Sequence, residues 1–375
     1  MGQYSDLDIQ GRILLGPGPS IVPPRVLHAL SHPLVGHLDP QFLELMNEVQ
    51  ELLRYVYQTD NPLTIPVSGT GSAGMEAALC NLIEEGDSVL VCVNGYFSTR
   101  MYQIAERYTK GVRRLDRTWG TVFTPEDLDR ALTKHPAKIV ALVHVETSTG
   151  TRQPMEGISE VVHRHGALLI LDCVASLGGE PVCVDEWDVD LAHGATQKCL
   201  SCPPGLAPLT VGPRAMDAIR NRKTPVANWY LDLSGIEHYW GKERTYHHTA
   251  PISLNYALRE ALRLIYIEGL DACFARHRAN AEMLWQGLED MGLQLVVPEE
   301  IRPTTLTTVW IPEGVEDLAI RKALQERYNV TIAGGLGDFK GRVWRIGLMG
   351  NSSRPQNVLL LLGALQRLIA KARTG

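Results

Sequence analysis

The chain has 375 residues, of which 45% are hydrophobic and 21% are charged, a composition ordinary for a globular enzyme. A chain of this length can form one large core or two smaller ones, and therefore a catalytic domain with a smaller companion. The net charge of -6 argues against nucleic acids and anionic membranes as partners, because both would require an excess of Lys and Arg.

Targeting signals are absent from the patterns at both ends of the sequence. The first 20 residues lack the basic start and apolar core of a secretory signal, and the final residues KARTG match no peroxisomal or retention signal. No apolar run is long enough to span a bilayer. We therefore expect a cytoplasmic protein.

Short apolar, β-branched runs alternate with helix-like segments through the first 212 residues. Buried strands that are separated by helices indicate a largely parallel sheet covered on both faces, which is α/β architecture. The predicted strands are residues 87–94, 138–145, 167–174 and 206–212, with helical periodicity over 97–108 and 154–165.

The pattern changes after Pro251. A long helical run over 253–293 predicts a helix pair or a kinked helix, and strand-like segments over 304–312 and 342–350 follow it. These features predict a smaller C-terminal α+β domain. We expect an N-terminal arm over 1–15, a large domain over 16–267 and the small domain over 268–375.

A glycine-rich segment, Gly69-x-Gly71-x-x-Gly74, matches the bare dinucleotide-binding pattern. That fold also needs an acidic residue at the end of the next strand, whereas this strand ends at Asn94. Two other interpretations stay open. Backbone N–H groups of Thr70, Gly71 and Ser72 at a helix start could bind an anion, or the segment could be an ordinary turn and helix cap.

Asp172 and Lys198 are the strongest candidates for chemistry. Asp172 ends a buried strand, where a carboxylate needs a positive partner or several donors, although it could instead cap the following loop. Lys198 lies among Ala, Thr, Cys and Leu. Desolvation there would lower its pKa and free the amine to attack a carbonyl, although a lone lysine is usually a solvated surface residue.

The same turn contains the pair Cys199 and Cys202. A zinc site would need two more ligands at matching spacing, and none is found in the sequence. A redox pair normally opens a helix, whereas Pro203 and Pro204 disfavour a helix here. We expect no metal site and interpret both cysteines as small packing residues.

Together these features match the needs of pyridoxal 5′-phosphate. That cofactor requires an anion cradle for its phosphate, a carboxylate at its ring nitrogen and a lysine that forms an aldimine. The glycine-rich segment, Asp172 and Lys198 supply these three groups in one chain.

The chain resembles the alanine–glyoxylate and serine–pyruvate aminotransferases of the class V, fold-type I family that depends on pyridoxal phosphate. The resemblance implies a mainly parallel seven-stranded sheet in the large, cofactor-binding domain. The blocks that carry it, from Leu14 to Gly350, are LLGPGPS, NPLTIPVSGTGSAGMEAAL, HVETSTG, DCVASLGG, TQKCLSCPPG, WYLDL, YHHT, GGLG and VWRIGLMG.

The resemblance also implies roles for individual residues. Lys198 would form the aldimine, Asp172 would pair with the ring nitrogen, and Arg345 would bind the substrate carboxylate with its planar fork. Tyr246 and Thr249 would reach the phosphate in a neighbouring subunit, which implies a homodimer with shared active sites. The other cofactor-binding residues would be Val174 and Phe97 at the ring, Thr147 near the ring oxygen, and Thr70, Gly71, Ser72 and Gln197 at the phosphate. Animal members have Trp in place of Phe97 and His in place of Ser72.

The resemblance implies transfer of an amino group from a small L-amino acid, alanine first, to glyoxylate by a ping-pong mechanism. The products would be pyruvate and glycine, and the partners are small amino acids and 2-oxo acids. Serine and ureidoglycine are alternative donors. His37 is expected at the mouth of the site and differs from the residue expected in ureidoglycine–glyoxylate aminotransferases. An NAD-dependent dehydrogenase built on Gly69–Gly74 is a distant alternative.

Overall fold

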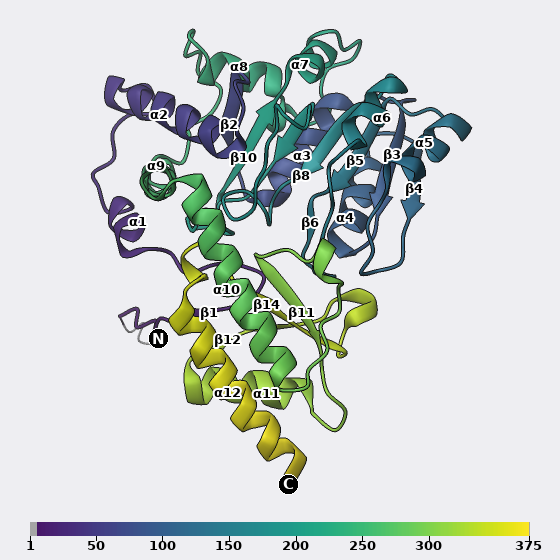
Figure 1. Ribbon diagram of the computed structural model, residues 1–375. Helices are drawn as coiled ribbons and strands as arrows, with labels where there is room; N and C mark the ends of the chain where they lie inside the picture. The colour runs from purple at the N-terminus through teal and green to yellow at the C-terminus, as the bar shows by residue number, and fades with distance from the viewer. Residues whose placement is uncertain (1–5, 375) are drawn as a thin grey trace, which may run out of the picture.

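A seven-stranded sheet forms the larger part of the molecule in the computed structural model, which describes residues 6–374 (Figure 1). The strand order is β2-β10-β9-β8-β5-β3-β4; β10 is antiparallel to β2 and β9, and the other neighbours are parallel. The expected mainly parallel sheet is therefore confirmed. The strands are β2 (Leu63–Ser68), β3 (Ser88–Val93), β4 (Gly111–Asp116), β5 (Ile139–Val143), β8 (Leu168–Asp172), β9 (Leu191–His193) and β10 (Leu206–Val211).

Helices cover both faces of this sheet, because its central strands are apolar on both sides. Along β3, Val89 and Val91 pack into one core while Leu90 and Cys92 pack into the core on the opposite face. The helices that pack around the sheet are α2 (Pro40–Tyr57), α3 (Gly71–Leu82), α4 (Tyr96–Ala105), α5 (Pro125–Lys134), α6 (Ile158–Arg164), α7 (Pro213–Arg220), α8 (Leu233–Trp240) and α9 (Ile252–Glu268).

The smaller part is a three-stranded antiparallel sheet with helices packed against it. Trp344, Ile346 and Leu365 are fully buried in its core. The predicted helical run after Pro251 is a helix pair that is interrupted at Gly269. The elements are β11 (Leu306–Trp310), β13 (Ala333–Gly334), β14 (Val343–Gly347), α10 (Leu270–Asp290), α11 (Asp317–Tyr328) and α12 (Pro355–Thr374).

The N-terminal segment joins this smaller part although it comes first in the chain. Strand β1 (Ile13–Leu14) pairs in parallel with β12 (Val330–Thr331), and Figure 1 shows the two strands close to α10. The chain then passes through α1 (Pro24–Ala29) into the large sheet. Elsewhere, after β5, β6 (Val145–Glu146) pairs with β7 (Thr151–Arg152) in a short antiparallel hairpin. The domain boundary at 267/268 stays a prediction, and residues 1–5 of the expected arm lie outside the described residues.

No helix within residues 6–374 is long and apolar enough to cross a membrane.

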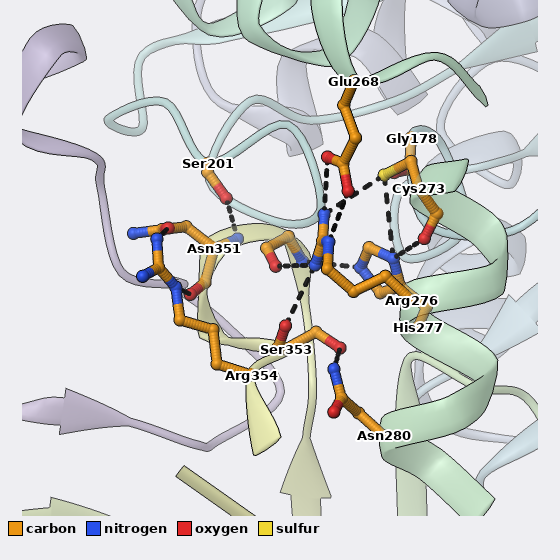
Figure 2. Close-up of polar contacts among 11 residues, drawn as sticks. Gly178, Ser201, Glu268, Cys273, Arg276, His277, Asn280, Asn351, Ser353 and Arg354 are labelled. Carbon is orange, nitrogen blue, oxygen red and sulfur yellow. Dashed lines mark hydrogen bonds and ion pairs between the residues drawn. The ribbon is translucent and has the colours of Figure 1, made fainter. Parts of the chain in front are cut away.

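A polar cluster on α10 holds the loop after β14 (Figure 2). The Arg276 guanidinium pairs with the Glu268 carboxylate at 2.5 and 2.9 Å, and its Nη1 donates to the carbonyls of Gly350 and Ser353 at 3.0 Å. His277 Nε2 accepts the Gly350 N–H at 2.9 Å. Burial lowers the pKa of His277 to about 4, so the ring is neutral. One of its nitrogens can then accept while the other donates.

The loop held by α10 in turn contacts the turn that contains Lys198. The Ser201 hydroxyl accepts the Asn351 N–H at 2.7 Å (Figure 2), and Ser20 donates from its hydroxyl to the Lys198 carbonyl at 2.6 Å. The smaller part and the N-terminal segment therefore fix the backbone around Lys198.

We expect Arg276→Ala to lower the free energy of unfolding by about 1–3 kcal/mol, because two carbonyls and one carboxylate lose their donors. Arg278→Ala on the same helix is the matched control. Its ion pair with Glu282 spans 3.6 Å and both side chains are 57% exposed, so the loss should stay within about 0.5 kcal/mol. Urea unfolding of the two variants checks this, and equal losses would contradict the role given to Arg276.

Candidate active site

The candidate site lies where three parallel strands end. The chain runs outward from β3 to β4 on one side and from β5 to β8 on the other, so the order of the strands reverses between β3 and β5. Ligands in such sheets bind outside the carboxyl ends of the strands at this reversal. Phe97 lies in the first turn of α4 after β3, Thr147 lies between β6 and β7 after β5, and Asp172 ends β8 at this edge.

Lys198 enters the site from the turn after β9. Its side chain is half-buried, and Nζ donates to the Pro17 carbonyl. Gly18 has φ +108°, and a Cβ at this position would lie 2.8 Å from Lys198 Nζ, so a side chain there would displace the amine. Burial lowers the pKa of Lys198 to about 8; the charge of Arg345 adds to the decrease, and that of Asp172 opposes it.

Asp172 is buried at the end of β8. Its Oδ1 accepts the Val174 N–H at 2.8 Å, and its Oδ2 lies 3.9 Å from Nε2 of His193 on β9. Val174 is half-buried, and its Cγ2 would lie 3.8 Å from a Cβ placed on Gly71. Asp172 and Val174 therefore lie beside the glycine-rich segment.

The glycine-rich segment opens a helix, as an anion site requires. Helix α3 begins at Gly71 with Thr70 as its N-cap, and the Thr70 and Ser72 side chains are exposed. The side-chain carbonyl of Gln197 is buried without a hydrogen-bond partner in the described part of the chain. Free backbone donors at a helix start fit a phosphate group, whereas the orphaned Gln197 oxygen is an acceptor that itself needs a donor.

Arg345 reaches the site from β14, the central strand of the small sheet. Its Nε donates to the Gly334 carbonyl at 2.8 Å and its Nη1 to the Thr147 carbonyl at 3.2 Å. Burial lowers the pKa of Arg345 to about 10, so the guanidinium keeps its charge at neutral pH. These two bonds fix the plane of the group and leave Nη2 for a ligand carboxylate.

Tyr246 and Thr249 lie on the loop between α8 and α9. Both side chains are exposed, and the Tyr246 ring lies 4.9 Å from the ring of His37. Their loop is tied to the glycine-rich segment by a 2.7 Å hydrogen bond between His248 Nε2 and the Ser68 hydroxyl. Contact of Tyr246 and Thr249 with a neighbouring subunit stays a prediction.

Glu146 is a buried residue of this site that the sequence analysis did not single out. Its carboxylate accepts the N–H groups of Phe97 and Ser98 at 3.0 and 2.9 Å and the Ser148 hydroxyl at 2.7 Å. Glu146 thus anchors the first turn of α4 and places the Phe97 ring, which the Arg100 guanidinium faces at 5.0 Å. The signal for it was an acid directly after the apolar run over residues 138–145, since a buried carboxylate needs several donors.

The residue that follows β3 bears on the dinucleotide interpretation. Where a dinucleotide site would need an acid after β3, the Asn94 side-chain amide donates to the Thr121 carbonyl at 2.9 Å.

Cys199 and Cys202 are both buried, and burial raises the pKa of each thiol well above its usual range. Protonated buried thiols pack as small apolar groups and are poor nucleophiles.

Residues 13–338 match the family model described as Aminotransferase class-V. The chain is a class V aminotransferase. Members of this family depend on pyridoxal phosphate, and the fold is that of a fold-type I aminotransferase.

Several aminotransferases are similar to this chain over nearly its whole length. The crystal structure of alanine–glyoxylate aminotransferase from Nostoc sp. superimposes with a TM-score of 0.97 at 53% identity, covering 98% of this chain and 97% of that one. The (S)-ureidoglycine–glyoxylate transaminase of Bacillus subtilis is 42% identical over 382 residues, 97% of this chain and 92% of the relative. Alanine–glyoxylate aminotransferase of Mus musculus is 40% identical over 364 residues, with 96% and 88% covered.

The apoprotein should combine with pyridoxal 5′-phosphate at a rate that rises with pH through a midpoint at about 8, because only the neutral Lys198 amine attacks. Arg345→Gln removes a positive charge that disfavours protonated Lys198. The pKa of Lys198 should therefore rise, and the midpoint should move to higher pH. Stopped-flow absorbance measures it, with the exposed Arg342→Gln as control. A midpoint that stays or falls in Arg345→Gln would contradict this assignment.

Proposed function

We propose that the protein transfers the amino group of L-alanine to glyoxylate and forms pyruvate and glycine with pyridoxal 5′-phosphate as cofactor. The observation that carries the proposal is the grouping of Lys198, Asp172 and Arg345 at one edge of the sheet. The choice of alanine is supported by the 53% identity with the Nostoc alanine–glyoxylate aminotransferase.

The residues at the sheet edge fit this cofactor. When bound, it supplies an electron sink for the negative charge that develops on the substrate α-carbon. Asp172 would hold the ring nitrogen, while Val174 and Phe97 would lie against the ring and Thr147 near its oxygen. The phosphate would be held by Thr70, Gly71, Ser72 and Gln197.

Arg345 and Lys198 perform the part of the reaction that belongs to the chain itself. Arg345 holds the substrate carboxylate and so aims the α-carbon at Lys198. With a pKa of about 8, the Lys198 amine is partly neutral near neutral pH and can take the α-proton. Donor and acceptor both carry a carboxylate for the same guanidinium, so they occupy the site in turn, which is a ping-pong order.

Ureidoglycine is the second candidate donor. The observation in its favour is the 42% identity with the Bacillus subtilis ureidoglycine–glyoxylate transaminase over 97% of this chain.

We also propose that the active unit is a homodimer. The exposed Tyr246 and Thr249 are then available to a neighbouring subunit, and His248 links their loop to the phosphate segment.

The donor is tested by a half-reaction. Protein loaded with pyridoxal 5′-phosphate should show a visible absorbance band that L-alanine bleaches in the absence of glyoxylate, because the amino group moves to the cofactor. Serine and (S)-ureidoglycine are compared under the same conditions, with glyoxylate added for turnover. Faster bleaching by one of these would replace alanine as donor, and protein that takes up no cofactor would overturn the proposal.

Lys198→Ala should reduce turnover by about 10³-fold or more, since the variant lacks the proton-transferring amine. Lys322→Ala, an exposed lysine on α11, is the control and should keep the wild-type rate. Steady-state rates with alanine and glyoxylate give the comparison. Near-normal turnover of Lys198→Ala would contradict the role of this lysine.

A further inference from the structure

His193 is a buried polar residue of the site to which the transfer reaction assigns no part. Its side chain is completely buried, and within residues 6–374 neither ring nitrogen has a hydrogen-bond partner. A buried polar group without a partner is costly and rare in folded proteins, so its presence calls for a function.

The sheet places His193 directly beside Asp172. The two residues are register partners on the parallel strands β8 and β9, so their side chains project from the same face of the sheet. Nε2 of His193 lies 3.9 Å from Oδ2 of Asp172, while Oδ1 is already bonded to the Val174 N–H. A shift of roughly 1 Å would bring the first pair within the usual hydrogen-bond range of about 2.7–3.2 Å.

The charge state of the ring suits a donor. Burial lowers the pKa of His193, and the nearby Asp172 opposes that decrease without reversing it. A neutral imidazole carries one N–H, which can donate to a carboxylate. A hydrogen bond to a charged acceptor is stronger than one to a neutral acceptor.

We propose that His193 is a positioning residue for the ring-nitrogen site: its Nε2–H donates to Asp172 Oδ2 and holds the carboxylate toward the cofactor. This inference rests on the proposed function, because it requires a pyridine ring at Asp172. The ligand is a pyridine with a protonated ring nitrogen, and His193 acts on it only through Asp172.

A pair of variants separates the hydrogen bond from packing. His193→Gln keeps an N–H near the position of Nε2, whereas His193→Met has similar length without a donor. The dissociation constant of the apoprotein for pyridoxamine 5′-phosphate is measured by titration calorimetry, which needs neither turnover nor the Lys198 amine. We expect about tenfold weaker binding for His193→Met and less than about threefold for His193→Gln.

A double-mutant cycle with Asp172→Asn tests the route through Asp172. In that background His193→Met should weaken binding by less than about twofold, because the charged acceptor is gone. Equal weakening in both backgrounds, equal weakening by the Gln and Met variants, or no effect of His193→Met would each overturn the proposal.

Controls keep the two proposals apart. Thermal unfolding of the apoproteins shows that the variants fold. Should His193→Met fail to fold, His193→Asn replaces it in the cycle, since its shorter amide cannot reach Oδ2. If wild-type protein does not bind pyridoxamine 5′-phosphate, the proposed function fails. Normal wild-type binding with an unaffected His193 variant overturns only the role of His193.

Discussion

The site depends on mutual compensation among buried charges at the carboxyl edge of the large sheet. An isolated lysine or carboxylate in this interior would be neutralised or would destabilise the fold. Here four charged residues influence one another: Lys198, Asp172, Arg345 and Glu146. Arg345 lowers the pKa of Lys198 and Asp172 raises it, while Glu146 raises the pKa of Arg345 and Asp172 raises that of Glu146. The outcome is a lysine amine that is less basic than usual and an arginine that keeps its charge.

Both parts of the molecule contribute to that compensation. Lys198 and Asp172 come from the larger part, whereas Arg345 comes from the small sheet and is oriented by a carbonyl from each part. The cluster around Arg276 fixes the loop after β14 against the turn of Lys198. A change in the relative position of the two parts would therefore alter the substrate clamp and the lysine environment together.

The sequence predicted the features that depend on local pattern. The apolar runs predicted the strands that end near Asn94, Asp172 and Gly212, and the apolar surroundings of Lys198 indicated a lysine with a lowered pKa. Arg345, Phe97 and Thr147 were named only through the family resemblance, because no local pattern marks them.

What the sequence could not predict depends on contacts between distant segments. Gly18 matters because Lys198 approaches it, and Glu146 because the first turn of α4 bonds to its carboxylate. His193 looks like one more residue of a short strand until the register places it next to Asp172. Strand register and chain reversal create these neighbours, and neither is encoded in a short stretch of residues.

The pairing of β1 with β12 has a consequence for the order in which the protein is made. Ile13 and Leu14 can pair only after Val330 and Thr331 have left the ribosome, and the same segment continues to Pro17, whose carbonyl accepts from Lys198. The large sheet can assemble earlier, because all its strands lie within residues 63–211. The complete site needs residues 13–17, the large sheet and Arg345 together, so it cannot be completed until the last part of the chain has been synthesised.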